Sequence, residues 1–258
     1  ERLDEVSSHG SAPCHVSIHD DLVHVANYGS GTVASYRLRA DGSFGPLVAV
    51  RQHHGSGPNP RQAGPHAHCV RPAPGGESVY AADLGTDRVV RYVAEASSDG
   101  TDMAVADETV MAPGSGPRHI AFHPDRPAAY VVCELDNRLV TFDVDESGRL
   151  HPGNEASTLP AGFAGDSIAA EVAVHPEGHR VYVSNRGHDS IATFAIDRPN
   201  DPPILLDHVS SGGRTPRHFA VNPGGRSLLV ANQDSDTLVS FELDDDALNL
   251  VQKASDAV

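Results

Sequence analysis

The feature that most constrains this chain is a repeat of about 50 residues. Short turn sequences recur as APGG, HPDR, HPEG and NPGG, and their prolines at positions 74, 124, 176 and 223 lie 50, 52 and 47 residues apart. A fifth copy, PCHVSIHDDLVHVANYG, occupies residues 13–29 with a shorter turn. Self-similarity at a nearly fixed spacing is typical of proteins built from repeated supersecondary units.

Each copy contains four short apolar runs. The turn joins the first two runs, a polar cluster such as Asn185-Arg186-Gly187 follows the second, and a third run such as TVASYRL or TLVSFEL comes next, before a weaker fourth run. A two-domain α/β fold would require amphipathic helices of about ten residues or more, and none is convincing here. The pattern predicts an all-β protein: a β-propeller of four-stranded blades, with about five blades in a single domain over residues 1–258.

The composition excludes several classes of partner and chemistry. The formal net charge is -16, whereas nucleic acids and anionic membranes require a basic surface. No apolar run approaches the ~20 residues that span a bilayer. The single lysine, Lys253, argues against Schiff-base and P-loop chemistry. The three cysteines lack zinc-site and redox-motif spacings, so we expect reduced thiols in a cytosolic protein.

Alignment of the copies predicts two rings of equivalent positions. In a propeller, the innermost strand of each blade lines the central channel, and its start lies on the same face as the turn after the second strand. The first ring contains His68, Arg118 and Arg217, with Cys14 and Ala170; the second contains Glu134 and Arg186, with Tyr28, Leu84 and Gln233. Ionisable side chains that vary on a repeated scaffold indicate a site built blade by blade.

Residues beside the first ring are further candidates. His66 lies two residues before His68 and can point the same way in an extended strand. Glu171 directly follows the ring position of its copy. It is expected either to contact substrate or to pair with a neighbouring arginine. The histidines that adjoin the ring in the other copies are expected mainly to pack at strand starts, and the last of them is also a candidate substrate contact: His15, His119 and His218.

Other polar residues of the repeat are expected to be structural. His123 and His175 are turn residues on the opposite face. The residues that end the second apolar runs are expected to fasten the following turns through hydrogen bonds from side chain to backbone: Asn27, Asp83, Asn185 and Asn232.

Structural and metal-binding interpretations compete with catalysis. Arg118 and Glu134 could form an ion pair between strands, and His68 could be a hydrogen-bonded channel residue. His66 and His68 with Glu134 or Glu171 would supply the two histidines and one carboxylate of a metal site. Arginines in the same ring oppose the binding of a cation, so no metal or other cofactor is expected.

Several long motifs carry a family resemblance. The strings NYGSGT, GSGPNPRQAGPHAH, DLGTDR, GPRHIAFHPD, TLPAGFAGDSIAAEV, SNRGHDSI, TPRHFAVNP and ANQDSDT resemble the bacterial lactonase family of seven-bladed propellers. This family includes propeller-type 6-phosphogluconolactonases and is related to fungal carboxymuconate lactonizing enzymes. Five copies are two fewer than seven, so the resemblance implies a partial propeller that lacks the first two blades and the last strand and has exposed strand edges.

The resemblance also implies a site and a reaction. The active residues proposed for the lactonizing relatives fall on His68, Arg118, Glu134 and Arg186. The implied reaction is the opening of a lactone by water, foremost 6-phosphogluconolactone to 6-phosphogluconate in the pentose phosphate pathway. The imidazole of His68 is suited to the base role. Glu134 would orient the base or the water, while Arg186 and Arg217 would grip a phosphate or carboxylate.

Two other functions remain open. A lactonizing isomerase acting on muconate-type dicarboxylates could use the same arginines, whereas a noncatalytic scaffold would not require ionisable residues at one channel mouth. In either enzyme the expected partner is a small anionic lactone or sugar acid. Arginines clustered within an acidic molecule create a local region of positive potential that attracts an anion. The oligomeric state is left open.

Overall fold

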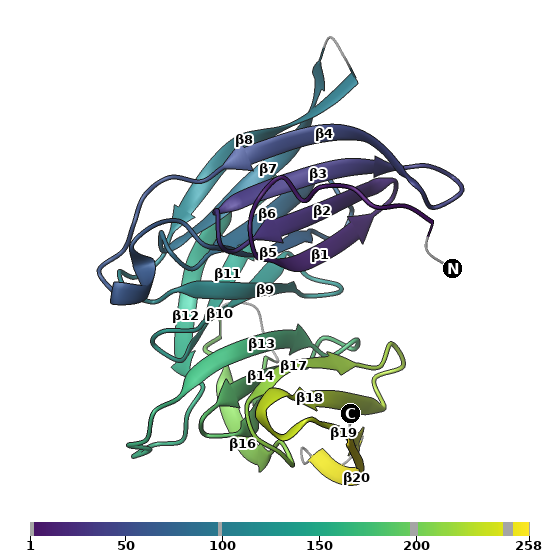
Figure 1. Ribbon diagram of the computed structural model, residues 1–258. Helices are drawn as coiled ribbons and strands as arrows, with labels where there is room; N and C mark the ends of the chain where they lie inside the picture. The colour runs from purple at the N-terminus through teal and green to yellow at the C-terminus, as the bar shows by residue number, and fades with distance from the viewer. Residues whose placement is uncertain (1–2, 98–99, 197–200, 245–249, 258) are drawn as a thin grey trace. The chain divides into compact units, whose positions relative to one another are not determined.

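The computed structural model describes residues 3–97, 100–196, 201–244 and 250–257. Within these ranges the chain forms five four-stranded antiparallel sheets and two short 3-10 helices (Figure 1). The predicted all-β fold of four-stranded propeller blades is therefore confirmed. The chain divides into two compact units, 1–120 with 146–149 and 121–145 with 150–258. That the whole forms a single domain stays a prediction.

The first unit contains two complete sheets, in which each strand pairs with the next along the chain. A 3-10 helix, η1 (Pro60–Gln62), lies between them. The first sheet contains β1 (Pro13–His19), β2 (Leu22–Asn27), β3 (Thr32–Leu38) and β4 (Phe44–Gln52), and the second contains β5 (Ala67–Pro72), β6 (Ser78–Asp83), β7 (Arg88–Ser97) and β8 (Gly100–Val110).

The other three sheets repeat this order, and the boundary between the units falls within the first strand of the third sheet. A second 3-10 helix, η2 (Gln233–Ser235), follows β18. The strands are β9 (Pro117–Phe122), β10 (Ala128–Cys133), β11 (Arg138–Val144) and β12 (Leu150–Ser157); β13 (Ile168–Val174), β14 (Arg180–Arg186), β15 (Ser190–Ala195) and β16 (Ile204–Ser210); and β17 (Pro216–Val221), β18 (Ser227–Asn232), β19 (Thr237–Leu243) and β20 (Leu250–Ala257).

Apolar side chains pack between successive sheets within each unit. In the first unit, Val70, Val79 and Tyr92 belong to one buried cluster that draws residues from both sheets. In the second unit, Phe194 belongs to one such cluster and Phe241 to another. β1 lies beside β5, and β13 lies beside β17. This packing brings the first strands of neighbouring blades together, and with them the predicted ring positions.

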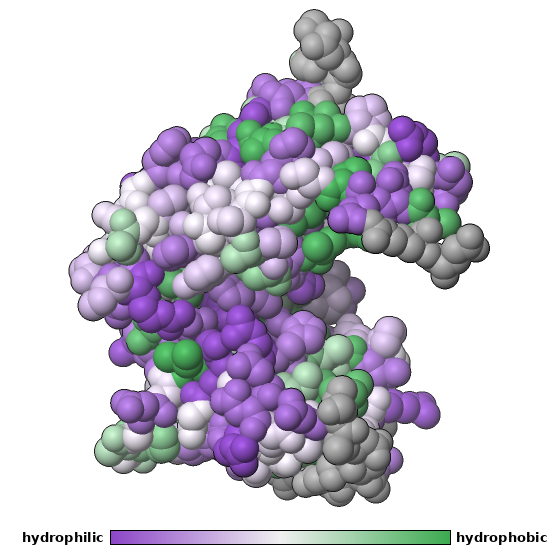
Figure 2. Space-filling model, in the orientation of Figure 1, coloured by the Kyte–Doolittle hydropathy of each residue, from purple (hydrophilic) through white to green (hydrophobic). Residues whose placement is uncertain are grey.

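The surface is mainly hydrophilic in the view of Figure 2, with hydrophobic residues in small patches. The hydrophilic surface agrees with the composition, which includes 35 acidic and 19 basic residues. Among the described residues, no helix has the length and apolar character needed to cross a bilayer. The three cysteines are reduced, as predicted, and two of them, Cys69 and Cys133, are buried.

Of the polar residues that end the second strands, only Asp83 fastens its following turn through backbone bonds as predicted, because the three asparagines bond to the backbone of the segment before the first strand of their sheet. The Nδ2 atoms of Asn27, Asn185 and Asn232 donate to the backbone oxygens of Ser8, Thr158 and Ser211 at 2.8, 2.7 and 3.0 Å. Asp83 also holds backbone, but its carboxylate accepts hydrogen bonds, whereas the asparagine side chains donate them. Its Oδ1 accepts from the backbone N–H groups of His66, Gly85 and Thr86, and its Oδ2 accepts from His53 Nδ1 at 2.5 Å.

The turn histidines join the first hairpins of neighbouring blades. His123 Nε2 donates to the carbonyl oxygen of Gly178 at 2.8 Å, and His175 Nε2 donates to that of Gly225 at 2.9 Å. Their Nδ1 atoms accept from backbone N–H groups of their own turns. His123 and His175 are therefore turn residues, as expected, and their rings are also buried against the next turn.

We expect Gly178→Ala to destabilise the protein through this contact. Gly178 has φ +74°, and a Cβ there would lie 2.4 Å from His123 Cε1. The left-handed backbone alone costs an alanine about 1 kcal/mol, and the collision adds to it, so we expect a loss of about 2 kcal/mol or more. Gly162→Ala is the matched control, because Gly162 has φ +81° with nothing within 4 Å of a Cβ. Chemical denaturation measures both, and equal losses would contradict the collision.

Candidate functional site

The predicted first ring lies at β-bulges. In four of the sheets, the pairing of the first strand with the second shifts immediately after the strand begins. The shifts fall between Pro13 and His15, Ala67 and Cys69, Ala169 and Val172, and Pro216 and His218. A bulge redirects side chains away from the regular alternation and is common beside active sites. In each of these four sheets, the bulge allows two successive residues of the first strand to point to the same side.

The first-ring residues occupy equivalent strand positions, as the alignment predicted. His68, Arg118 and Arg217 are the second residues of β5, β9 and β17. His68 and Arg118 are buried, at 5% and 2% exposure, whereas Arg217 is exposed. Arg118 belongs to the first unit and Glu134 to the second. An ion pair between these two residues stays a prediction.

In the first unit, His68 belongs to a chain of aromatic contacts. The ring of His66 stacks on Tyr28 with centroids 4.4 Å apart, and Tyr28 meets His68 edge-on at 5.6 Å. His68 lies 5.1 Å from His119, which in turn meets His15 at 5.3 Å. His66 is also fixed by its Nδ1, 2.8 Å from the carbonyl oxygen of Tyr28. Both candidate histidines thus contact the ring of Tyr28.

His15, Cys69 and His119 bring three potential metal-ligand atoms within 4.8 Å of one another. Cys69 Sγ lies 3.7 Å from His15 Nε2, close to the ~3.5 Å that two ligands on one tetrahedral zinc require. However, His15 Nδ1 accepts from the N–H of Val70 at 3.4 Å, which places the hydrogen of the neutral ring on Nε2. A metal ion would require the other tautomer. This set differs from the His66 and His68 site considered from the sequence.

His175, Glu177 and His179 form a second cluster of this kind in the second unit. Both nitrogens of His175 already have backbone partners: Nε2 donates to Gly225 and Nδ1 accepts from Glu177 N–H. A metal ion would have to displace one of these bonds, which fasten the turn. We therefore assign this cluster to structure.

Glu134 and Arg186, both of the second ring, form a buried ion pair. Arg186 Nη2 lies 2.7 Å from Glu134 Oε2, and the side chains are 9% and 2% exposed. The same nitrogen donates to the carbonyl oxygen of Ala169, in β13, at 3.1 Å. The two residues, which the alignment predicted to be equivalent, are therefore in direct contact. The pair places a negative charge at the end of β10 and a positive charge at the end of β14.

Glu171 and His218 form a second pair in the same unit. His218 Nδ1 lies 2.5 Å from Glu171 Oε2, with side-chain exposures of 64% and 3%. Glu171 Oε1 also accepts from the N–H of Val172, and the backbone N–H of Glu171 donates to Ser184 Oγ. The expectation that His218 packs at a strand start is wrong, because its ring is largely exposed and held by a carboxylate.

Sequence analysis placed His15, Glu171 and His218 beside the first ring, but it did not predict their contacts and did not single out Cys69. Cys69 follows His68, and Glu171 and His218 follow the first-ring positions of their copies. These residues contact one another between successive blades, as in His15 with Cys69 and Glu171 with His218. A periodic pattern shows which residues are equivalent but not where an extra residue enters a strand. The available signal was a residue with a polar or titratable side chain directly after each first-ring position.

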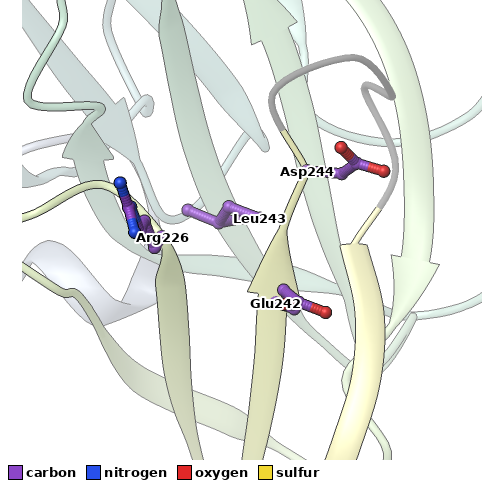
Figure 3. A pocket seen from close by; sticks show the side chains of 4 residues that line it. All are labelled: Arg226, Glu242, Leu243 and Asp244. Carbon is purple, nitrogen blue, oxygen red and sulfur yellow. The ribbon is translucent and has the colours of Figure 1, made fainter.

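A pocket of about 400 Å³ lies at the opposite end of the last sheet, lined by Arg226, Glu242, Leu243 and Asp244 (Figure 3). Figure 3 shows Arg226 across Leu243 from the two carboxylates. Leu243 N–H donates to the carbonyl oxygen of Arg226 at 2.9 Å, which joins the strand end to the turn. The lining contains none of the predicted site residues, and we assign it no function.

Comparison with known proteins agrees with this geometry. The family model described as a lactonase with a seven-bladed β-propeller matches residues 1–258. A 6-phosphogluconolactonase of Bacillus subtilis is 38% identical over 213 residues, which are 81% of this chain and 60% of the relative. The chain spans about three fifths of the length of the curated relatives it matches.

Two solved structures are similar throughout the chain. A periplasmic gluconolactonase of Pseudomonas aeruginosa matches with a TM-score of 0.87 and 36% identity, over 94% of this chain and 69% of its own. A protein from Lactobacillus plantarum matches with a TM-score of 0.87 and 31% identity, over 95% and 71% of the two chains. The blade geometry described above is therefore shared with these proteins.

Proposed function

Since this chain belongs to the lactonase family of seven-bladed β-propellers, we propose that the protein hydrolyses the ester bond of a lactone. The proposed substrate is the lactone of an anionic sugar acid, foremost 6-phosphogluconolactone, which would place the reaction in the pentose phosphate pathway. The name of the Bacillus subtilis relative supports this choice. The reduced cysteines favour a cytosolic location.

The observation that carries the proposal is the pairing of four ionisable residues around β13. Arg186 joins Glu134 to the carbonyl oxygen of Ala169, and Glu171, two residues further along the strand, holds His218. Ester hydrolysis needs a base for water, positive or hydrogen-bonding groups for the developing oxyanion, and a proton for the leaving alkoxide. Imidazole and guanidinium groups held by buried carboxylates provide these functions.

The other predicted residues are also proposed to bind substrate. His68 and Arg118 lie buried at strand starts of the first unit, and each would contact the substrate. Exposed Arg217 would bind the phosphate of the substrate, since its planar guanidinium matches a phosphate in two hydrogen bonds. His66 would contribute a contact through the face of its ring. Muconate-type cyclisation and a noncatalytic scaffold gain no support from a specific observation.

Hydrolysis of freshly generated 6-phosphogluconolactone tests the proposal. We expect the intact protein to accelerate it clearly over spontaneous hydrolysis, and His68→Ala and Arg118→Ala each to reduce kcat/KM at least about 100-fold, since each removes a group from the reacting centre. Arg37→Ala is the matched control, because Arg37 pairs with Asp21 outside the predicted site. Circular dichroism verifies folding. No acceleration by the folded wild-type protein would reject this substrate.

A further inference from the structure

The Glu171–His218 pair has the geometry of an oriented base, and we propose that His218 is the general base of the reaction and Glu171 its positioning residue. The inference rests on the lactone hydrolysis proposed above. It differs from the sequence-based expectation, in which His68 had the base role and His218 contacted substrate.

The hydrogen bond between the two residues determines which ring nitrogen can act. An ionised carboxylate only accepts hydrogen bonds, so His218 Nδ1 carries the hydrogen that points to Glu171 Oε2 at 2.5 Å. In the neutral ring, Nε2 then has the lone pair that can take a proton from water. Glu171 thus selects the catalytically useful tautomer and stabilises the imidazolium that forms.

The hydrogen-bond partner distinguishes His218 from the other candidate base. His218 Nδ1 is held by Glu171, which is 3% exposed and is itself held by the backbone N–H of Val172. The ring of His68, in contrast, packs against Tyr28 and His119. A buried carboxylate that holds an imidazole in one tautomer is the arrangement that suits a general base.

The bulge in β13 explains how one strand serves both ion pairs. The register shift between Ala169 and Val172 places Ala170 and Glu171 opposite Ser184. Ala169 just before the bulge holds Arg186 through its carbonyl oxygen, and Glu171 within it holds His218 on β17. The base and the guanidinium are thus positioned by residues two apart on the same strand.

The proposed reaction balances as follows. Nε2 of His218 accepts a proton from water while the water oxygen bonds to the lactone carbonyl carbon, giving a tetrahedral oxyanion. The oxyanion collapses, the bond between the acyl carbon and the ring oxygen breaks, and the imidazolium returns its proton to the leaving alkoxide. The product is the open hydroxy acid. Glu171 remains ionised throughout.

His218→Ala tests the base in the intact protein. We expect kcat for 6-phosphogluconolactone to fall at least about 100-fold, and added imidazole to restore part of it, because a small base can occupy the space that the removed ring leaves. His151→Ala is the matched control, since His151 is an exposed histidine, 54%, held by Asp145 at 2.7 Å outside the site. An active wild type whose His218→Ala variant retains its rate would overturn the base role and leave the proposed function intact.

Glu171→Gln tests the positioning role. We expect kcat to fall about tenfold or more with KM changed less than twofold, and imidazole to give no rescue, because the ring of His218 is still present but misoriented. A rise in KM with unchanged kcat would overturn the positioning role and indicate a substrate contact instead.

An activated aryl ester, p-nitrophenyl acetate, separates this inference from the choice of substrate. If the wild type does not hydrolyse the lactone but cleaves the aryl ester in a manner that His218→Ala abolishes, the base stands and the lactone proposal fails. If wild type and variant cleave the ester equally and the lactone is not hydrolysed, the base role fails as well.

Discussion

Replacing Glu134 with alanine is expected to lower the free energy of unfolding by about 3–5 kcal/mol and to abolish lactone hydrolysis. Its carboxylate is the 2.7 Å partner of Arg186, and both side chains are almost completely buried. Removing one member of a buried ion pair leaves the other charge without compensation in a poorly solvated environment, which is the costly case. Chemical denaturation and the initial rate of hydrolysis measure the two losses.

A double variant separates the two effects. Glu134→Leu with Arg186→Met replaces the pair by apolar side chains of similar volume, a change that is often neutral or stabilising. We expect it to recover most of the stability lost in Glu134→Ala and none of the activity, because the guanidinium that would stabilise developing negative charge is absent. Recovery of hydrolysis along with stability would show that the pair only supports the fold. A loss below about 1 kcal/mol in Glu134→Ala would contradict its burial.

The repeated strands could be predicted because their signals are local. The run TVASYRL coincides with β3 and TLVSFEL with β19, since turn residues define their ends and branched or aromatic residues fill them. The equivalence of His68, Arg118 and Arg217 also followed from the sequence, because the prolines of the first turns fix how far each residue lies from its strand start.

The pairing of the ring residues could not be predicted in the same way. Whether Arg186 meets Glu134 depends on the packing of one sheet against the next, and periodicity within a chain does not encode that separation. The contact of Glu171 with His218 depends in addition on bulges in β13 and β17, where one extra residue changes the face to which a side chain points. The strand positions were therefore predictable, and the chemistry between them required the structure.

Acid is expected to destabilise the protein through His24. The residue is 1% exposed, and its Nδ1 lies 2.8 Å from Ser35 Oγ, while its buried Nε2 has no hydrogen-bond partner among the described residues. Burial, with a smaller contribution from the nearby His19, lowers the pKa of His24 from 6.5 to about 4. The folded state thus holds this ring neutral at pH values at which the unfolded chain protonates it.

The sign of the pH dependence follows from that difference. Above pH 6.5 neither state binds the proton, and the stability is at its full value. As the pH falls towards 4, the unfolded state gains a proton that the folded state does not, and the loss reaches about 2 kcal/mol at pH 5. Burial also lowers the pKa of His123 and of His188, which adds to the loss in the same direction.

His24→Gln isolates this contribution. The variant is expected to be less stable than the wild type at pH 7.5, and the difference should shrink by about 2 kcal/mol at pH 5, because the variant no longer has the imidazole that protonates on unfolding. The matched comparison is His188→Gln, for which the change should be smaller because that ring is only partly buried. Urea denaturation at the two pH values gives the free energies. If the difference between wild type and His24→Gln is the same at both, His24 is already protonated in the folded protein, and the acid sensitivity must arise from other groups.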